Sequence, residues 1–187
     1  MVIVGMGQAV TGLPLAERVD RLTRANFDDL VAQYEKPLLR FLYAMVHDPE
    51  LAADLCQDTF LSAYRAAPAL TRDLNVAAWL YTIALNHARG VMRRRRVLSW
   101  VPFALGRHDR PIATVDAGVR AAQRDELREL LQQLPVEQRA CLLLHAEGFR
   151  YGEIARILNC SVGAVKLRML RARERCLRLS AQGEEDL

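Results

Sequence analysis

Glycine and proline are sparse in this sequence, and runs that look like β-strands are hard to find. The 187 residues include ten glycines and seven prolines, whereas 51% of the residues are apolar. A composition of this kind is typical of a soluble, mostly helical protein with enough apolar side chains to form a core. We therefore predict an all-α fold.

Cysteine is scarce as well, and its four residues, Cys56, Cys141, Cys160 and Cys176, are scattered. No CxxC motif occurs and no cysteine–histidine pair has metal-ligand spacing, so we expect no metal site. Dispersed thiols fit a reducing, cytoplasmic compartment. The first residues lack the basic start and long apolar segment of a signal peptide, and no apolar run reaches the roughly 18 residues that span a bilayer. We expect no membrane insertion.

Motifs of catalysis are missing. The chain has no P-loop, no HExxH and no G-x-S-x-G, which mark phosphate-binding loops, zinc proteases and serine hydrolases. Its four histidines are scattered, and the GMGQAVTG stretch near the N-terminus is not a GxGxxG motif. We predict no catalytic residue and no cofactor.

Charges are plentiful but separated along the chain. Residues 26–73 hold eight acidic and four basic side chains, whereas 89–110 hold seven arginines and one aspartate, and 166–178 hold six basic residues and one glutamate. Such separation indicates one polyanionic partner and a second, different partner. The alternative for any single patch is a solvated helix face.

Apolar residues recur with a helical period and divide the chain into two groups of helices. Pro37 is expected to begin a second helix within 27–47, or to kink the first. Residues 98–118, with two prolines and two glycines, break the pattern and are predicted to be a linker. The predicted helices are 27–47, 49–66, 75–97, 119–134, 136–147 (ended by Gly148), 151–158 and 162–179. The expected architecture is two small helical domains joined by a flexible linker.

The last two helices have the signature of a helix-turn-helix motif. Asn159 can adopt the left-handed conformation of a sharp turn, and Ser161 is a good N-cap for the second helix. The opposite face of that helix starts with small residues and continues with basic ones, which suits an approach to base edges and phosphates in the DNA major groove. An ordinary helical hairpin is the alternative. The residues expected to point inward are Val165, Met169, Ala172 and Cys176.

Two earlier helices also carry patterned polar faces. The outward face of helix 49–66 contains two aspartates that repel slightly unless a basic partner covers them; its members are Asp54, Gln57, Asp58 and Leu61. One face of helix 75–97 carries side chains of the types that bind base edges and phosphates; its members are Thr82, Asn86, Arg89, Arg93 and Arg96. Solvated faces are the alternative in both cases.

Together these segments resemble a bacterial RNA polymerase sigma factor of the extracytoplasmic-function (ECF) subgroup. Its region 2 is similar to DPELAADLCQDTFLSAYRA followed by AAWLYTIALNHARGVMRRRR. Its region 4 is similar to LQQLPVEQRACLLLHAEGFRYGEIARILNCSVGAVKLRMLRARERC. The resemblance implies a flexible lead-in (1–25), a region 2-like helical bundle (26–97), the linker (98–118), a region 4-like helix-turn-helix domain (119–180) and an acidic tail (181–187).

The resemblance also implies roles for individual residues. Those implied to dock on the clamp helices of the polymerase's largest subunit are Asp54, Gln57, Asp58, Phe60 and Leu61. Those implied to capture and open the −10 element are Asp73, Asn75, Trp79, Thr82, Asn86, Arg89, Arg93 and Arg96. Those implied to read the −35 element are Ser161, Gly163, Ala164, Lys166, Leu167, Arg168, Leu170, Arg171 and Arg173. Helix 136–147 is implied to meet the polymerase flap.

The partners implied by the resemblance are core RNA polymerase, promoter DNA and an anti-sigma protein that holds the factor inactive. Leu167 and Leu170 depart from the family, which often has small polar residues or a histidine there, and they could contact thymine methyl groups or a partner protein. Three other readings compete: a conventional DNA-binding regulator with a sensory domain, an enzyme, and a redox or metal sensor that uses the cysteines. The sequence shows no strands in 26–97, no catalytic motif and no sign of a lowered thiol pKa.

Overall fold

The computed structural model describes residues 24–67, 75–98 and 127–185. Its elements are α1 (Arg24–Val46), α2 (Pro49–Ala66), α3 (Val76–Leu98), α5 (Val136–Ala146), α6 (Tyr151–Ile157) and α7 (Val162–Glu185). Residues 127–132 are helical too. The all-α prediction is confirmed for this part of the chain. Most of the predicted lead-in and linker, together with Asp73 and residues 119–126, lies outside the described residues.

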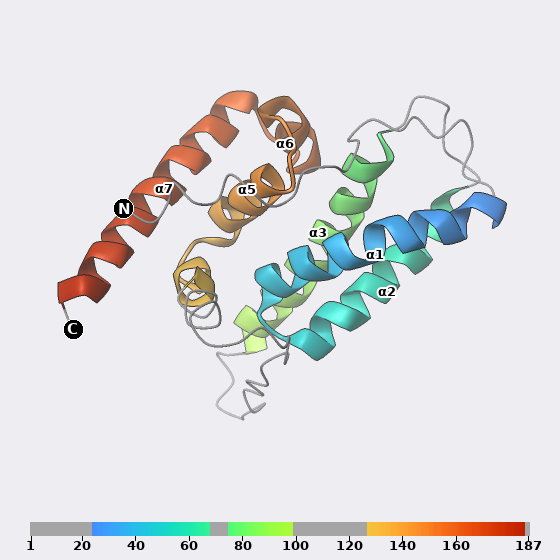
Figure 1. The fold of residues 1–187 in the computed structure, drawn as a ribbon, viewed down its shortest axis with the longest axis horizontal. Helices are drawn as coiled ribbons and strands as arrows, with labels where there is room; N and C mark the ends of the chain where they lie inside the picture. Colours follow the sequence, from blue (N-terminus) through green and yellow to red (C-terminus); the bar gives the residue numbers. More distant parts are fainter. Residues whose placement is uncertain (1–23, 68–74, 99–126, 186–187) are drawn as a thin grey trace.

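The first three helices pack against one another as a bundle, and α5, α6 and α7 form a second group beside it (Figure 1). Leu38, Phe41, Leu42 and Met45 are buried in the first group. They lie directly after Pro37, which is inside α1. The predicted second helix at Pro37 is therefore wrong. A proline removes one backbone hydrogen bond from a helix, and the burial of the apolar residues that follow it stabilises the uninterrupted helix.

The start of α2 follows the sequence prediction. Asp48 is its N-cap: the side-chain Oδ1 accepts a hydrogen bond from the Leu51 amide at 3.0 Å, and Pro49 occupies the first turn, where its missing N–H costs nothing. The other carboxylate oxygen of Asp48 accepts from Arg95 at 2.7 Å. Burial would raise the pKa of Asp48, but the Arg95 hydrogen bond and the Leu51 amide outweigh it and lower the pKa.

The second group contains the predicted helix-turn-helix. Gly148 follows α5 with a φ of 92°, and Asn159 adopts the left-handed conformation with a φ of 50° in the turn between α6 and α7. The Ser161 hydroxyl accepts from the Ala164 amide at 3.1 Å and caps α7. Val165, Met169 and Ala172 are buried and Cys176 is half-buried. The helix continues to Glu185, beyond the predicted end at 179, so the segment assigned as an acidic tail is largely helical.

The two groups of helices are in direct contact, which the sequence analysis did not predict. Helix α3 packs against α6, and α1 packs against α5. Tyr81 joins the two cores, because its ring meets Phe41 and Phe149 edge to face, with ring centroids 5.0 Å apart in both pairs. The buried apolar residues of both groups therefore form one continuous cluster.

Candidate polymerase and promoter surfaces

Helix α2 presents the predicted acidic face to solvent. Asp54, Gln57 and Asp58 are exposed, and Leu61, one turn further along the helix, is 50% exposed. Phe60 is only 9% exposed and lies in the core beneath this face. The structure thus brings four of the five predicted docking residues together on one surface, whereas Phe60 belongs to the core and lines the groove between α1 and α2.

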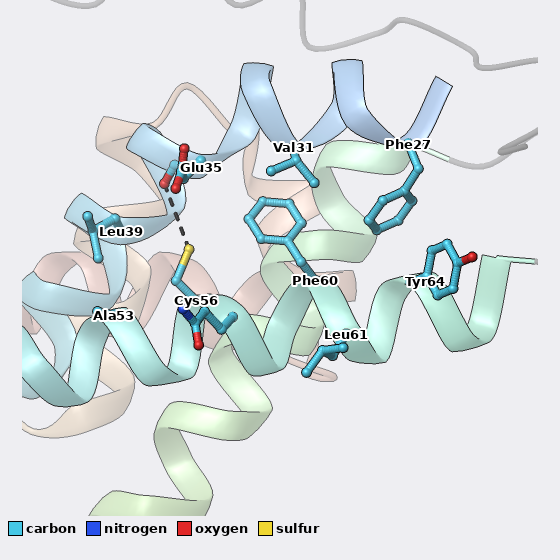
Figure 2. Close-up of a pocket in the computed structure, with 10 residues that line it drawn as sticks. Phe27, Val31, Glu35, Leu39, Ala53, Cys56, Phe60, Leu61 and Tyr64 are labelled. Atoms are coloured by element: carbon cyan, nitrogen blue, oxygen red, sulfur yellow. Dashed lines mark hydrogen bonds between the residues drawn. The ribbon is translucent and has the colours of Figure 1, made fainter. Parts of the chain in front are cut away.

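A groove of about 450 Å³ runs beside the acidic face, between α1 and α2 (Figure 2). Phe27 and Tyr64 meet edge to face at one end, with ring centroids 5.2 Å apart, and Gln57 and Leu61 are among the residues that line the groove. Cys56 lines the groove and its thiol donates to the Glu35 carbonyl at 3.9 Å. Burial, followed by the charge of Glu35, raises the pKa of Cys56 to about 11, so the thiol is protonated at neutral pH.

Asn75 lies at the start of α3, and both the oxygen and the nitrogen of its side-chain amide form hydrogen bonds. Its Oδ1 accepts from the Ala78 amide at 2.9 Å and caps the helix, while its Nδ2 donates to Glu153 Oε1 at 3.1 Å. The other oxygen of Glu153 accepts from the Arg150 amide at 2.9 Å at the start of α6. A residue predicted to contact the −10 element is thus tied to the helix-turn-helix group in this structure.

The other residues of the predicted DNA-binding face of α3 differ in how exposed they are. Arg89 is half-buried and donates to Glu137 at 2.6 Å, whereas Asn86 and Arg93 are exposed. Thr82 is half-buried and donates to the Ala78 carbonyl at 2.7 Å. Trp79 is also half-buried and packs against the core. The side chain of Arg96 is outside the described residues.

Helix α7 carries the predicted −35 face on its outer side. Ser161, Gly163, Lys166, Arg171 and Arg173 are exposed, and Ala164 is half-buried. A Cβ added at Gly163 would meet only the Ser161 hydroxyl, at 3.8 Å, so the first turn of α7 is open to the close approach of a ligand. The basic side chains one and two turns further along can reach a phosphate backbone on either side.

Two features of α7 qualify this picture. Leu167 and Leu170, which depart from the family pattern, are 45% and 55% exposed and belong to the outer face. Arg168 is only half-exposed, because it pairs with Glu137 at 3.3 Å and donates to the Cys160 sulfur at 3.3 Å. Of the predicted −35 residues, Arg168 is therefore the one with a structural partner in α5.

Sequence reasoning missed Arg139, which is 5% exposed in α5. Its guanidinium donates to the Met45 carbonyl at 2.7 Å, and also to the carbonyls of Gln132 (2.9 Å) and Leu134 (3.2 Å). It therefore connects the end of α1 to the second group of helices. The pattern of apolar residues in α5 does not predict the burial of Arg139, since an arginine on an apolar helix face looks like an interruption of that pattern.

His47, in the turn after α1, was also missed. It has a positive φ of 58°, and neither ring nitrogen has a hydrogen-bond partner. Burial and the positive charges of Arg139 and Arg128 lower its pKa from 6.5 to about 4. The ring is therefore neutral at physiological pH, beside the contact between the two groups.

Tyr81 and Glu147 form a further bond across this contact. The Tyr81 hydroxyl donates to Glu147 Oε2 at 2.9 Å. Burial raises the pKa of Glu147, although the bond from Tyr81 and the charge of Arg40 act in the opposite direction. Burial and the neighbouring carboxylate also raise the pKa of Tyr81, so the hydroxyl remains a donor.

Nothing in the described ranges has the geometry of a metal centre: no group of three or more histidine, cysteine or carboxylate side chains could hold an ion. None of the helices between residues 24 and 185 that the structure describes is long and apolar enough to cross a membrane. Burial raises the pKa of Cys141 to about 11, and it also raises that of Cys176, which disfavours the reading as a thiolate-based sensor.

The fold and these surfaces define a DNA-binding protein of the helix-turn-helix class with a second helical domain. The family model for Sigma-70 region 2 matches residues 30–97, and that for Sigma-70, region 4 matches residues 124–176. The chain is 36% identical to RNA polymerase sigma-H factor of Pseudomonas aeruginosa, over 86% of this chain and 89% of that one. It is 34% identical to ECF RNA polymerase sigma factor EcfG of Rhodopseudomonas palustris, over 88% and 91%.

Two solved structures have the same fold. The sigma factor RpoE in complex with the anti-sigma factor NepR, from Bartonella quintana, aligns with a TM-score of 0.68 and 28% identity, covering 83% of this chain and 97% of that one. CnrH in complex with the cytosolic domain of CnrY aligns with a TM-score of 0.66 and 26% identity, covering 88% and 92%. The chain belongs to the ECF sigma factors of the sigma-70 family, and it is not an enzyme.

Proposed function

We propose that this ECF sigma factor binds core RNA polymerase through the acidic face of α2, opens the −10 element with α3 and the segment before it, and reads the −35 element with the outer face of α7. The observation that carries the proposal is the outer face of α7. It combines a glycine with open space at the helix start and exposed basic residues further along, which is the arrangement that a recognition helix needs in the major groove.

The wider organisation follows from this assignment. Residues 26–97 and 119–180 act as the two promoter-binding domains, and 98–118 connects them. Helix α5 meets the polymerase flap. Because the polymerase and the chromosome lie in the bacterial cytoplasm, the factor acts there, without a cofactor.

An anti-sigma protein is the regulatory partner that fits this chain. Two structural relatives are complexes, one of them with a protein described as an anti-sigma factor. Leu61 on α2 and the neighbouring Leu167 and Leu170 on α7 are large exposed apolar side chains, of the kind that a protein partner would cover.

In-vitro transcription tests the function directly. Purified core RNA polymerase is supplied with fragmented genomic DNA, with and without this protein. Transcripts that begin at defined sites only when the protein is present would support sigma activity, and their aligned upstream sequences would reveal both promoter elements. If the protein neither binds the core enzyme nor directs new transcripts, the proposal fails.

The polymerase face has its own test. The double variant Asp54→Ala/Asp58→Ala should weaken binding to core polymerase roughly tenfold, because two exposed carboxylates lose their basic partners. The control is Asp28→Ala/Asp29→Ala, which removes two exposed carboxylates from α1. Titration of labelled protein with core enzyme measures both, and equal affinities for the two variants would exclude the assigned face.

A further inference from the structure

Helix α7 carries a row of exposed leucines that the −35 assignment explains only in part. Leu167 and Leu170 belong to the predicted −35 residues, but Leu177 does not, although its side chain is 57% exposed. A recognition helix contacts base edges with its N-terminal residues. Leu177 lies roughly 22 Å along the helix from Val162, its first residue, at a rise of ~1.5 Å per residue. Contact with bases therefore does not account for the exposure of Leu177.

The spacing of this row is that of a coiled-coil seam. Its residues follow one another at steps of three, four and three positions, and all of them are exposed; they are Leu167, Leu170, Glu174 and Leu177, which we call the leucine seam. Such steps alternate between the a and d positions of a heptad. The opposite face of α7, around Val165, is already buried in the core. The helix thus has a second, narrower apolar stripe, of the width that packs against a single partner helix.

Basic side chains border the leucine seam on both sides, at the e and g positions of the same heptad. They are exposed, and they are Lys166 and Arg173 on one side and Arg171 and Arg178 on the other. Side chains at e and g face those of the partner helix and determine which partner is accepted. A second copy of α7 would bring like charges together, whereas a helix with acidic e and g positions would form ion pairs along both edges.

Glu174 adds a further condition, because it places one carboxylate inside the seam at an a position. A single polar residue at such a position fixes the register of two paired helices, and a basic side chain of the partner would face it. A membrane surface fits this stripe less well, since helices that lie on membranes have a broad apolar face rather than a seam interrupted by an acid.

We propose that the leucine seam of α7 docks one amphipathic helix of a protein partner, with large apolar side chains at its a and d positions and acidic ones at its e and g positions. The docked helix covers Leu167, Leu170 and the neighbouring Lys166, so it excludes DNA from the face assigned to the −35 element. In this respect the proposal rests on the proposed function, and it names the chemistry of the protein partner that this face accepts.

A designed peptide of about three heptads is the probe, with leucine at a and d and glutamate at e and g. Its glutamates repel one another and keep the labelled peptide from pairing with itself. Fluorescence anisotropy measures its affinity for the full-length protein, and competition with a 30-base-pair duplex of random sequence, roughly three helical turns, measures exclusion of DNA. We expect saturable binding that the duplex reverses. Peptide and duplex that bind together would overturn the proposal.

Two control peptides separate the apolar seam from simple charge attraction. One has serine in place of every leucine, and the other has lysine in place of every glutamate. Both should bind at least roughly tenfold more weakly than the probe. If the serine peptide binds as well as the probe, negative charge alone is sufficient and the docking of a helix on the seam is excluded.

The substitution Leu177→Ala separates the seam from the DNA-binding surface, because Leu177 is not assigned to the promoter. Alanine favours the helix, and circular dichroism checks that α7 remains folded. The affinity for the probe peptide should fall roughly tenfold, as expected for an apolar side chain at the centre of an interface, while the affinity for the duplex stays unchanged. Leu127→Ala is the matched control, since Leu127 is an exposed leucine outside α7, and it should change neither affinity.

These two readouts distinguish a failure of the seam from a failure of the proposed function. Equal peptide affinities for the wild type and Leu177→Ala would overturn the docking proposal, whatever the DNA affinity is. A protein that binds the peptide through Leu177 but does not bind promoter DNA would refute the −35 assignment and support the docking surface.

Glu174→Leu tests the register of the seam, because it replaces the one polar residue with the side chain that an all-leucine peptide prefers. The affinity for the probe should rise roughly tenfold. Glu174→Gln makes the same change in charge without adding a large apolar group, and it should raise the affinity less. Equal gains for the two variants would exclude position 174 from the seam.

Two other occupants of the seam have their own readouts. Sedimentation of the full-length protein would reveal a dimer that Leu177→Ala abolishes if the occupant is a second copy of the chain. Flotation with vesicles of equimolar phosphatidylcholine and phosphatidylglycerol would reveal membrane binding that the same substitution abolishes. Either result would overturn the proposal, and we expect a monomer that stays free of the vesicles.

Discussion

Helices α3 and α7 are both rich in arginine and both are assigned to promoter DNA, yet the structure presents them differently. On α3, Arg89 and the preceding Asn75 donate to carboxylates of the second domain. On α7, Lys166, Arg171 and Arg173 are exposed. The difference shows that a basic helix face in a sequence predicts only which ligands its side chains can bind. Whether the face is available depends on what the rest of the chain places against it.

Charge reversal on α7 should have the largest effect, because the basic residues of its outer face are exposed in the structure. The variant Lys166→Glu/Arg171→Glu should lower affinity for a random 30-base-pair duplex roughly a hundredfold at ~0.1 M salt. It should also reduce the slope of log affinity against log salt by about two, since each phosphate contact contributes ~0.9. Anisotropy titrations at several salt concentrations measure both quantities.

The control for that variant is Lys36→Glu/Arg65→Glu, which makes the same change in net charge at exposed positions of α1 and α2. It should reduce the affinity by a much smaller factor, through long-range repulsion alone. If the two double variants show the same salt slope, the outer face of α7 is not the DNA-binding surface, and the contrast between the helices disappears.

His47 should make the contact between the domains sensitive to acid. In the packed form, with the two groups of helices in contact as in the structure, the pKa of His47 is about 4. In an open form with the groups apart, loss of the burial and of the charges of Arg139 and Arg128 would restore a value near 6.5. The packed form is then fully stable above pH 6.5 and loses stability as the pH falls toward 4, because only the open form takes up the proton. The partial exposure of the ring limits the loss to roughly 1 kcal/mol.

The variant His47→Asn isolates this effect, since asparagine tolerates the positive φ at this position. Scattering profiles at pH 7.5 and pH 5 should show more opening on acidification for the wild type than for the variant. Glu147, whose pKa is raised by burial, works in the opposite direction in both proteins and cancels in the comparison. Identical pH responses of the wild type and the variant would show that protonation of His47 does not weaken the contact between the domains.

The smallest effect is expected at the start of α7. Gly163→Ala adds a methyl group that meets only the Ser161 hydroxyl, so the domain should fold normally. If base edges approach this turn closely, affinity for the mapped −35 element should fall several-fold, about 1 kcal/mol. Gly152→Ala in α6 is the control, because its added methyl group meets nothing within 4 Å. Unchanged −35 affinity for Gly163→Ala would place the bases further along the helix.

Much of the fold could be predicted from the sequence because the relevant signals are local. Asn159 in the turn and Ser161 as a cap do what their side chains favour in isolation, and the structure confirms both. Asp48 caps the start of α2 in the same local way. The exposed positions of Asp54, Gln57 and Asp58 follow from the period of 3.6 residues per turn. The prediction of a second helix at Pro37 was wrong, because the burial of the apolar residues on both sides of it is not a local property.

By itself the sequence determined the helices, the helix-turn-helix and the separation of acidic and basic faces, since capping, turn geometry and amphipathic periodicity depend on residues a few positions apart. Tertiary structure alone decided which of those faces are covered. The bonds from Arg89 to Glu137, from Asn75 to Glu153 and from Arg139 to Met45 join residues 48, 78 and 94 positions apart. No periodic pattern encodes such pairs, because they form only when the two groups of helices pack together around a common apolar centre.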